Sequence, residues 1–224
     1  MLRATVVIDY QNVHLTARDI FCPDHSPHRA LIHPMQYARA ALRRRNANQR
    51  EGHDPAEVHR VLVYRGLPHA DYDPAQNGRN QEQAAKWREA GAEVHLRDLK
   101  YRYQRGADGR PILDVNGKKI PTNNGEEKGV DVLCALACVR ESRDPDVDLV
   151  VLSSRDTDLV PALDEVYDMR GREEGIAKIE TFSWYDSNAR RNFGNLRASG
   201  ARRVWNTNLD CRIFEAALDR GDYR

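Results

Sequence analysis

The sequence contains few cysteines and no long apolar run. Its 224 residues include four cysteines, which cannot form the framework of a disulfide-rich protein and which suit a reducing compartment. No apolar stretch approaches the length that spans a bilayer. From Thr5 the chain enters an apolar strand, too soon after Met1 for a signal peptide. We therefore expect a cytoplasmic protein with no membrane partner.

An excess of charge of one sign is also missing. Charged residues make up 31% of the chain, yet the formal net charge is only +1. This balance argues against a disordered chain and against a uniformly basic surface that coats nucleic acid, so any contact with nucleic acid must be local. The length suits a single α/β domain, which we place at residues 1–205, with a helical tail at 206–224 packed on it.

Apolar runs rich in β-branched residues alternate with helical stretches along the chain. The runs occupy residues 5–8, 58–63, 93–96, 147–152 and 176–182. This alternation predicts a three-layer α/β/α sandwich, in which helices cover both faces of a mainly parallel, doubly wound sheet. Helices are expected at 76–90, where Gly91 ends the helix, and at 129–140.

The spacing of side chains predicts how three helices pack. A helix that opens at Pro34 has Arg45 away from its apolar face, which carries Met35, Ala38, Ala41 and Leu42. The helix at 129–140 is expected to keep Cys134 and Cys138 as small core residues and to pack through Val132, Leu133, Leu136 and Val139. Asp158 can cap a helix that contains Pro161 in its first turn.

Residues 100–127 do not fit the alternation of strands and helices. Asn116-Gly117 lies between short extended runs, a pattern that predicts a tight turn. We therefore expect a β-hairpin excursion from the sheet, close to the acidic residues described next. Its aromatic and basic side chains could guide a substrate; they are Tyr101, Arg102, Tyr103 and Arg105.

Acidic residues follow the apolar strands at two places. Asp9 ends the strand at 5–8, and Asp156 and Asp158 follow the strand at 147–152. Asp131 opens the helix just before that second strand. Parallel sheets bind ligands beyond the carboxyl ends of their strands, so these carboxylates are expected to converge there. Such a cluster predicts a hard divalent cation, Mg²⁺ or Mn²⁺ rather than Zn²⁺, and hydrolysis of a phosphate ester.

Three motifs give the chain a family resemblance. They are Ile8-Asp9-Tyr10-Gln11-Asn12, Lys128-Gly129-Val130-Asp131 and Ser154-Arg155-Asp156-Thr157-Asp158. In this order they resemble the NYN domains, which are PIN-like, metal-dependent ribonucleases, and the resemblance extends from about Leu2 to Trp184. It implies that the catalytic and metal-binding residues are Asp9, Asp131, Asp156 and Asp158, with Asn12 beside them. The chain departs from the family pattern at Arg155 and Leu159, and neither departure removes an acid.

The resemblance and the basic residues together predict an endoribonuclease that hydrolyses single-stranded or looped RNA. The side chains expected to contact the substrate are Asn12, Lys128, Ser154, Arg190 and Arg191. Arginines after the last expected strand surround Phe193 and Trp205 and could grip phosphates and stack bases; they include Arg197, Arg202 and Arg203. Glu127 could join the shell of the metal. PIN-like domains often pair, so a homodimer is expected by analogy.

Three other functions could use the same residues, to different degrees. The acids would serve a structure-specific DNA nuclease equally well. They could also belong to a non-catalytic RNA-binding module. A phosphatase of the haloacid dehalogenase type is disfavoured, because Gln11 stands where such enzymes place their second aspartate.

Overall fold

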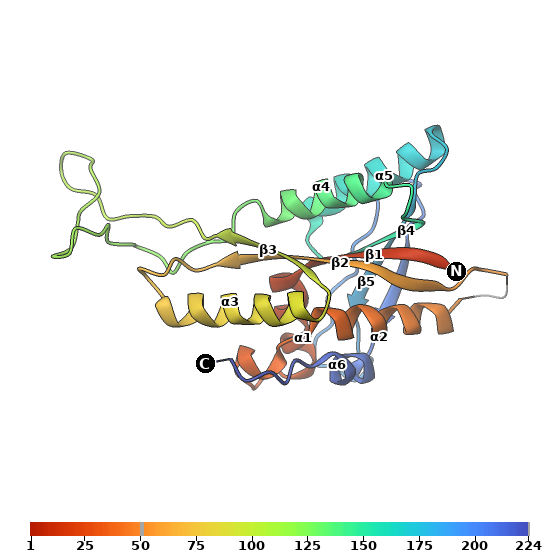
Figure 1. The fold of residues 1–224 in the computed structure, drawn as a ribbon, viewed down its shortest axis with the longest axis horizontal. Coiled ribbons are helices and arrows are strands. Elements are labelled where there is room, and N and C mark those ends of the chain that lie inside the picture. The colour runs from red at the N-terminus through yellow and green to blue at the C-terminus, as the bar shows by residue number, and fades with distance from the viewer. Residues whose placement is uncertain (50–51, 224) are drawn as a thin grey trace.

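The computed structural model describes residues 1–49 and 52–223. A six-stranded, all-parallel sheet forms its centre, with strand order β3-β2-β1-β4-β5-β6 (Figure 1). The strands are β1 (Leu2–Asp9), β2 (Ala56–Leu67), β3 (Glu93–Asp98), β4 (Leu149–Ser153), β5 (Lys178–Trp184) and β6 (Trp205–Leu209). The five strands expected from the apolar runs are therefore confirmed, with shifted ends.

Helices cover both faces of the sheet. One face carries α1 (Tyr10–Phe21), α2 (Pro34–Ala47), α3 (Pro74–Glu89) and α6 (Cys211–Ala217), and the other carries α4 (Val130–Ser142) and α5 (Val160–Arg172). Alternation along β1 explains the two cores, because Val6 and Ile8 face the first and Val7 faces the second. The three-layer sandwich is confirmed. Within the described ranges, no helix combines the length and the apolar character needed to cross a membrane.

The carboxyl-terminal segment differs from the expected helical tail. Residues 205–209 form β6, which pairs in parallel with β5 and completes the sheet. Only then does α6 follow, and its Phe214 stacks on Phe21 of α1 at a centroid distance of 4.9 Å. The strand was missed because its sequence, Trp-Asn-Thr-Asn-Leu, buries only Thr207 and Leu209 fully. The segment 206–224 is thus partly sheet and partly helix.

Helix α2 begins at Pro34 and buries the apolar face expected for it. Arg45, which was expected away from this apolar face, is also buried, at 1% exposure. Arg45 donates from Nε and Nη2 to the two carboxylate oxygens of Glu180 on β5, at 2.8 and 2.9 Å. The Lys178 ammonium also contacts Glu180 at 2.8 Å. This buried ion pair fixes α2 to the sheet.

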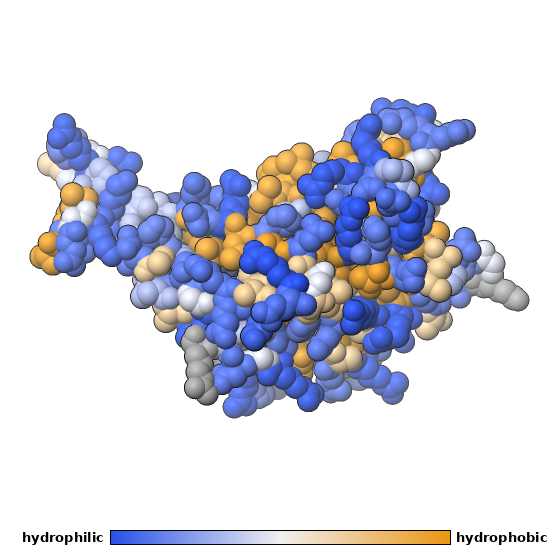
Figure 2. Space-filling model, in the orientation of Figure 1, coloured by the Kyte–Doolittle hydropathy of each residue, from blue (hydrophilic) through white to orange (hydrophobic). Residues whose placement is uncertain are grey.

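The packing of α4 also differs from the expectation. Val132 and Leu136 are 54% and 60% exposed, and Figure 2 shows apolar surface over this helix. The side that meets the sheet carries Cys134, Ala137 and Cys138, all fully buried, as expected for the two cysteines. Leu133 and Val139 pack at the margin of this core. The small side chains allow the helix backbone to approach the sheet closely.

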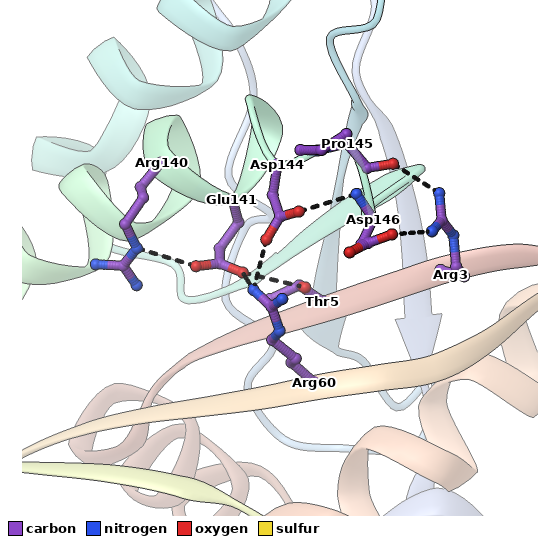
Figure 3. Close-up of polar contacts among 8 residues, drawn as sticks. All are labelled: Arg3, Thr5, Arg60, Arg140, Glu141, Asp144, Pro145 and Asp146. Atoms are coloured by element: carbon purple, nitrogen blue, oxygen red, sulfur yellow. Dashed lines mark hydrogen bonds and ion pairs between the residues drawn. The ribbon is translucent and has the colours of Figure 1, made fainter.

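A polar network fastens the end of α4 to the amino-terminal edge of the sheet (Figure 3). Arg60 of β2 donates from Nη1 to Glu141 at 2.9 Å and to Asp144 at 2.8 Å. The buried Glu141 also accepts a hydrogen bond from Arg140. Beside them, Arg3 of β1 bonds to Asp146 and to the carbonyl of residue 145. These contacts hold α4, β1 and β2 in register and leave the opposite edge open for a site.

Residues 100–127 leave the sheet after β3 as a long arm (Figure 1). Antiparallel bridges hold its two sides together, and a tight turn forms at Asn116-Gly117, where Asp114 accepts from the amides of Asn116 and Lys118. The excursion and its turn are confirmed. Tyr101 and Tyr103 pack on Tyr72, at centroid distances of 4.7 and 6.2 Å. The aromatic side chains therefore anchor the arm to the loop between β2 and α3.

Candidate functional site

The candidate site lies where β1 and β4 end. These strands are neighbours, with Ile8 paired to Ser153, and the connections from them lead to helices on opposite faces of the sheet. Open α/β sheets bind their ligands at such a point. Asp9 is the last residue of β1 and is only 6% exposed. Its Oδ2 accepts from the Ser154 hydroxyl at 2.8 Å and its Oδ1 from the amide of Asn12 at 3.3 Å.

The environment of Asp9 disfavours its negative charge. Burial raises its pKa to about 6, and the hydrogen bonds from Ser154 and Asn12 offset only part of this effect. The carboxylates of Asp156 and Asp131 raise the pKa further. Among the described residues no cation forms an ion pair with Asp9. Asp9 is thus a buried acid that a bound cation would stabilise.

Asp131 reaches the site from the first turn of α4. The turn before it depends on Gly129, whose φ of +78° is unfavourable for residues with a side chain. A Cβ there would meet the guanidinium of Arg97 at 3.2 Å, and Arg97 in turn donates from Nε to the carbonyl of Lys128 at 2.6 Å. The Lys-Gly-Val-Asp motif therefore sets the start of α4 and the position of Asp131.

Asp156 and Asp158 lie at the short 3-10 helix η2 (Thr157–Leu159), which follows β4. Asp156 caps this helix, with its Oδ1 accepting from the amide of Asp158 at 3.0 Å. The expected capping role of Asp158 was wrong, since α5 starts at Val160 without a side-chain cap. The reason is the extra 3-10 turn, which moves the cap upstream. Asp158 is exposed, at the outer margin of the site.

Glu127, a candidate for the shell of the metal, is held by contacts with β2 and α1. Its Oε1 accepts from the backbone amide of Gly66 on β2, and the side-chain nitrogen of Gln11 can donate to both carboxylate oxygens at 2.8 Å. Burial raises the pKa of Glu127 to about 7, and the charge of Asp9 raises it as well. Gly66 was missed by sequence reasoning; a Cβ on it would lie 2.6 Å from Cγ of Glu127.

We call Asp9, Glu127, Asp131 and Asp156 the acid group. Cys134 lies fully buried near its members: burial raises the pKa of this thiol, and so do the charges of Asp9, Glu127 and Asp131. The donors are all carboxylate oxygens, which suits Mg²⁺ or Mn²⁺. In the described part of the chain, however, no three acidic, histidine or cysteine side chains stand close enough to hold one ion. The donor chemistry therefore fits a hard cation, whereas the side chains are not gathered around a single point.

The residues expected to contact substrate fall into two groups. Ser154 and Asn12 position the acid group: the Ser154 hydroxyl accepts from the amide of Asp156 at 3.1 Å, and Asn12 Oδ1 accepts from the amide of Arg155 at 3.1 Å. Lys128 is a surface residue, 64% exposed along its side chain, and pairs with Glu126 at 3.5 Å. Lys128 is three residues before Asp131 in sequence, and its exposed ammonium group is accessible to a ligand.

The arginines that were expected to surround Phe193 and Trp205 lie in separate places. Two guanidinium groups contact the ring of Phe193, with Arg155 at 4.2 Å and Arg191 at 4.8 Å from the ring centroid. Arg190 lines a neighbouring groove with Asp19 and Phe21. Arg155, which the family pattern does not predict, thus joins the positive surface beside Asp156.

The other arginines expected to contact RNA, which are Arg197, Arg202 and Arg203, do not reach the site. Arg202 pairs with Asp168 on α5 and lies 4.0 Å from Asp164, so its role is structural. Trp205 starts β6 and pairs with Glu180, which places it towards the amino-terminal edge of the sheet, away from the acid group. Arg197 and Arg203 line a groove with Trp205 there. These arginines were expected beside the acids, but residues 185–204 connect the carboxyl end of β5 with the amino end of β6. The later part of this connection therefore lies at the opposite end of the strands from the acid group.

Comparisons with known proteins leave the family open. No protein-family model matches the chain, and no curated protein matches it significantly. Among solved structures, the fold is similar to the crystal structure of a protein of unknown function from Vibrio parahaemolyticus RIMD 2210633, with a TM-score of 0.43 and 19% identity over 81% of this chain and 80% of that chain. The resemblance to NYN domains therefore stays a prediction that rests on the three sequence motifs.

Proposed function

We propose that this protein is a metal-dependent endoribonuclease that hydrolyses phosphodiester bonds in single-stranded or looped RNA. One observation carries the proposal: Asp9 is buried at the switch point of the sheet without a cation partner among the described residues, and the charges of Asp131 and Asp156 act on it. Such an arrangement lowers the stability of the metal-free protein, and carboxylates perturbed in this way cluster at binding and catalytic sites. The order of the three motifs supports the nuclease class.

In this proposal the acid group holds a divalent cation. Asp9, Asp131 and Asp156 would bind Mg²⁺ or Mn²⁺, with Asp158 at the outer margin, and the bound ion would activate water and neutralise charge on the phosphate. Ser154 keeps Asp9 oriented, because its hydroxyl bridges Oδ2 of Asp9 and the amide of Asp156. The products would carry a 5′-phosphate and a 3′-hydroxyl, as the resemblance implies.

The positive surface beside the site favours a single strand. Arg155 and Arg191 both make cation–π contacts with Phe193, and such a cluster of guanidinium and aromatic groups suits unpaired bases and their phosphates. The base of the arm adds Lys128, Arg190 lies in the adjoining groove, and both would contact phosphates. Because the protein as a whole has a net charge of only +1, binding depends on these local cations.

The test is cleavage of an end-labelled, mixed-sequence RNA in Mn²⁺, in Mg²⁺ and in chelator. Wild type should cut only with metal, and Asp131→Asn should lose cutting while keeping its fold and most of its RNA affinity. Asp146→Asn is the matched control, since Asp146 is exposed and pairs with Arg3 at the amino-terminal ends of the strands, opposite the acid group. Full activity of Asp131→Asn would refute the assignment. A DNA strand of the same sequence distinguishes a ribonuclease from a DNA nuclease.

A second candidate is a non-catalytic RNA-binding module of the same fold. It is favoured by the finding that the described acids are not gathered around one point. RNA binding by wild type without cleavage in either metal would support it.

Two further properties complete the proposal. We place the enzyme in the cytoplasm, because all four cysteines are free thiols. Homodimer formation stays a prediction, and the exposed Val132 and Leu136 on α4 are the apolar side chains that a second copy would cover.

A further inference from the structure

A pocket of about 340 Å³ lies between α1, β2 and α3, next to the acid group. We call it the amide pocket, because three carboxamides line it from α3. Its walls also include Tyr10 and Leu15 from α1 and Leu99 from the base of the arm. The volume falls within the range of small-molecule sites and is sufficient for a nucleobase with part of its sugar.

The carboxamides come from one side of α3. Gln76, Asn80 and Gln83 are spaced by four and three residues, so their side chains lie on the same helix face. Asn80 and Gln83 are only 3% and 2% exposed. Gln76 donates from Nε2 to Oδ1 of Asn80 at 2.7 Å, and Asn80 Nδ2 lies 3.5 Å from the carbonyl of Gly66. Gln76 also accepts from Arg79 at 3.1 Å, and Gln83 from Arg65. A carboxamide has two N–H hydrogens and two lone pairs, so beyond these contacts each keeps a donor and an acceptor, which matches the edge of a base.

Arg65 supplies the positive charge of the pocket. Its guanidinium lies over the rings of Tyr10 and Trp87, at 4.8 and 5.7 Å from their centroids, and donates to Oε1 of Gln83. Burial lowers the pKa of Arg65, whereas the negative charge of Glu127 raises it. In the described ranges Arg65 forms no ion pair, so it can donate to an acceptor on a ligand.

The remaining groups favour an uncharged ligand group over a phosphate. His14 donates from Nε2 to the carbonyl of Pro27 at 2.8 Å, and burial lowers its pKa to about 4, so it is neutral near pH 7. Glu127 adds a carboxylate to the opposite wall. One cation facing one acid gives little net attraction for an anion, whereas the amides and apolar walls suit the edge and the face of a base.

The pocket shares its wall with the candidate active site. Glu127 and Gln11 line it, and the charge of Asp9 in the acid group raises the pKa of Glu127. We propose that the amide pocket binds one unpaired nucleobase of the RNA strand, next to the scissile phosphate, and that Gln76, Asn80 and Gln83 select which base enters. The proposal rests on the proposed function, since the base belongs to the strand that is cut.

The first test is nucleotide binding without metal. The four ribonucleoside 5′-monophosphates are titrated separately into ¹⁵N-labelled wild type in chelator, and the side-chain amide signals of Asn80 and Gln83 are followed by NMR. We expect one nucleotide to shift these signals at the lowest concentration. Gln76→Leu should weaken its binding at least about fivefold, as expected for the loss of base-edge hydrogen bonds. Gln81→Leu is the control, because Gln81 is on α3 but exposed and outside the pocket.

The second test is the base preference of cleavage in Mn²⁺. Wild type should prefer one base beside the cut, and Gln76→Leu should lose this preference while Gln81→Leu keeps it. The pocket proposal is overturned if no nucleotide shifts the Asn80 and Gln83 signals, or if Gln76→Leu binds like wild type. Nucleotide binding in the pocket without RNA cleavage by wild type would instead overturn the nuclease and leave the pocket standing, so the two failures are distinguishable.

Discussion

The hydroxyl of Ser154 donates a hydrogen bond to Oδ2 of Asp9 at 2.8 Å, across the junction between β4 and β1. The same oxygen of Ser154 accepts from the amide of Asp156 at 3.1 Å. One side chain thus links two members of the acid group that are 147 positions apart in sequence. Ser154 acts on Asp9 by orienting it and by stabilising its charged form.

Ser154→Ala should shift the pH dependence of cleavage. The hydrogen bond from Ser154 lowers the pKa of Asp9, so its removal should raise that pKa above about 6. The acidic limb of the profile of kcat/KM against pH should then move to higher pH. Ser199→Ala is the control, since Ser199 is exposed and its hydroxyl donates to Asp164 on α5, a carboxylate outside the acid group. An unchanged acidic limb in Ser154→Ala would show that Asp9 is not the titrating group.

Asp9→Asn should make the metal-free protein more stable at neutral pH. The folded-state pKa of Asp9 is raised from 3.8 to about 6, so the folded state binds the proton more tightly than the unfolded state does. The associated stability is present below pH 4 and is lost as the pH rises through 6. The substitution Asp9→Asn removes the buried charge, and with it the loss in the free energy of unfolding, which is about 3 kcal/mol at pH 7. Urea unfolding in chelator at pH 4 and pH 7 measures it. An equal gain at both pH values would show that the buried charge of Asp9 is not the cause.

Mn²⁺ should reverse the order of stability of these two proteins. A cation that binds only the folded state raises the free energy of unfolding by RT ln(1 + L/Kd), where L is the concentration of the free cation. Wild type should gain stability from Mn²⁺, and Asp9→Asn should gain much less. The measurement is the melting temperature across a Mn²⁺ titration, with Ca²⁺ as a second ion. Equal stabilisation of both proteins would place the metal away from Asp9.

Much of the site could be predicted from sequence because it depends on strand ends. The apolar runs of β1 and β4 identify buried parallel strands, and the carboxyl ends of such strands meet at one edge. Asp9, Ser154 and Asp156 follow directly from this rule. Asp131 was placed by its motif, and the structure supports its position through the charge that it exerts on Asp9.

The errors arose where a side chain depends on a distant partner. The burial of Arg45 was not predicted, because an arginine is rarely buried without a partner and its partner Glu180 is 135 residues away. Glu127 was only a weak candidate because its position depends on the amide of Gly66, on another strand. On α4, apolar Val132 was expected to pack, yet the sheet accepts the smaller Cys134. Periodicity identifies a helix face but not the space available to it.

Glu180→Gln should strongly destabilise the fold without a direct effect on the site. The substitution leaves the buried guanidinium of Arg45 without its carboxylate, which costs about 3–5 kcal/mol for a buried pair. Hydrogen bonds from Arg45 and Lys178 outweigh burial and lower the pKa of Glu180, so its contribution is present above pH 4.5 and is lost as the pH falls through the folded-state pKa. Urea unfolding at pH 7 measures the effect, and the exposed Glu174→Gln serves as control. A change below about 1 kcal/mol, the size typical of surface pairs, would mean that the pair is solvated.

Gly66→Ala should impair the site and the fold together, because no space exists for the added methyl group. Its Cβ would lie 2.5 Å from Cδ2 of Leu99 and 2.6 Å from Cγ of Glu127, so Glu127 must move away from the β2 amide that holds it. We expect a loss of about 1–3 kcal/mol of stability and weaker cleavage. Gly78→Ala on the exposed face of α3 is the matched control, since nothing lies within 4 Å, and it should stabilise the helix by up to about 1 kcal/mol. If Gly66→Ala cleaves RNA at the wild-type rate, Glu127 is not needed at its present position.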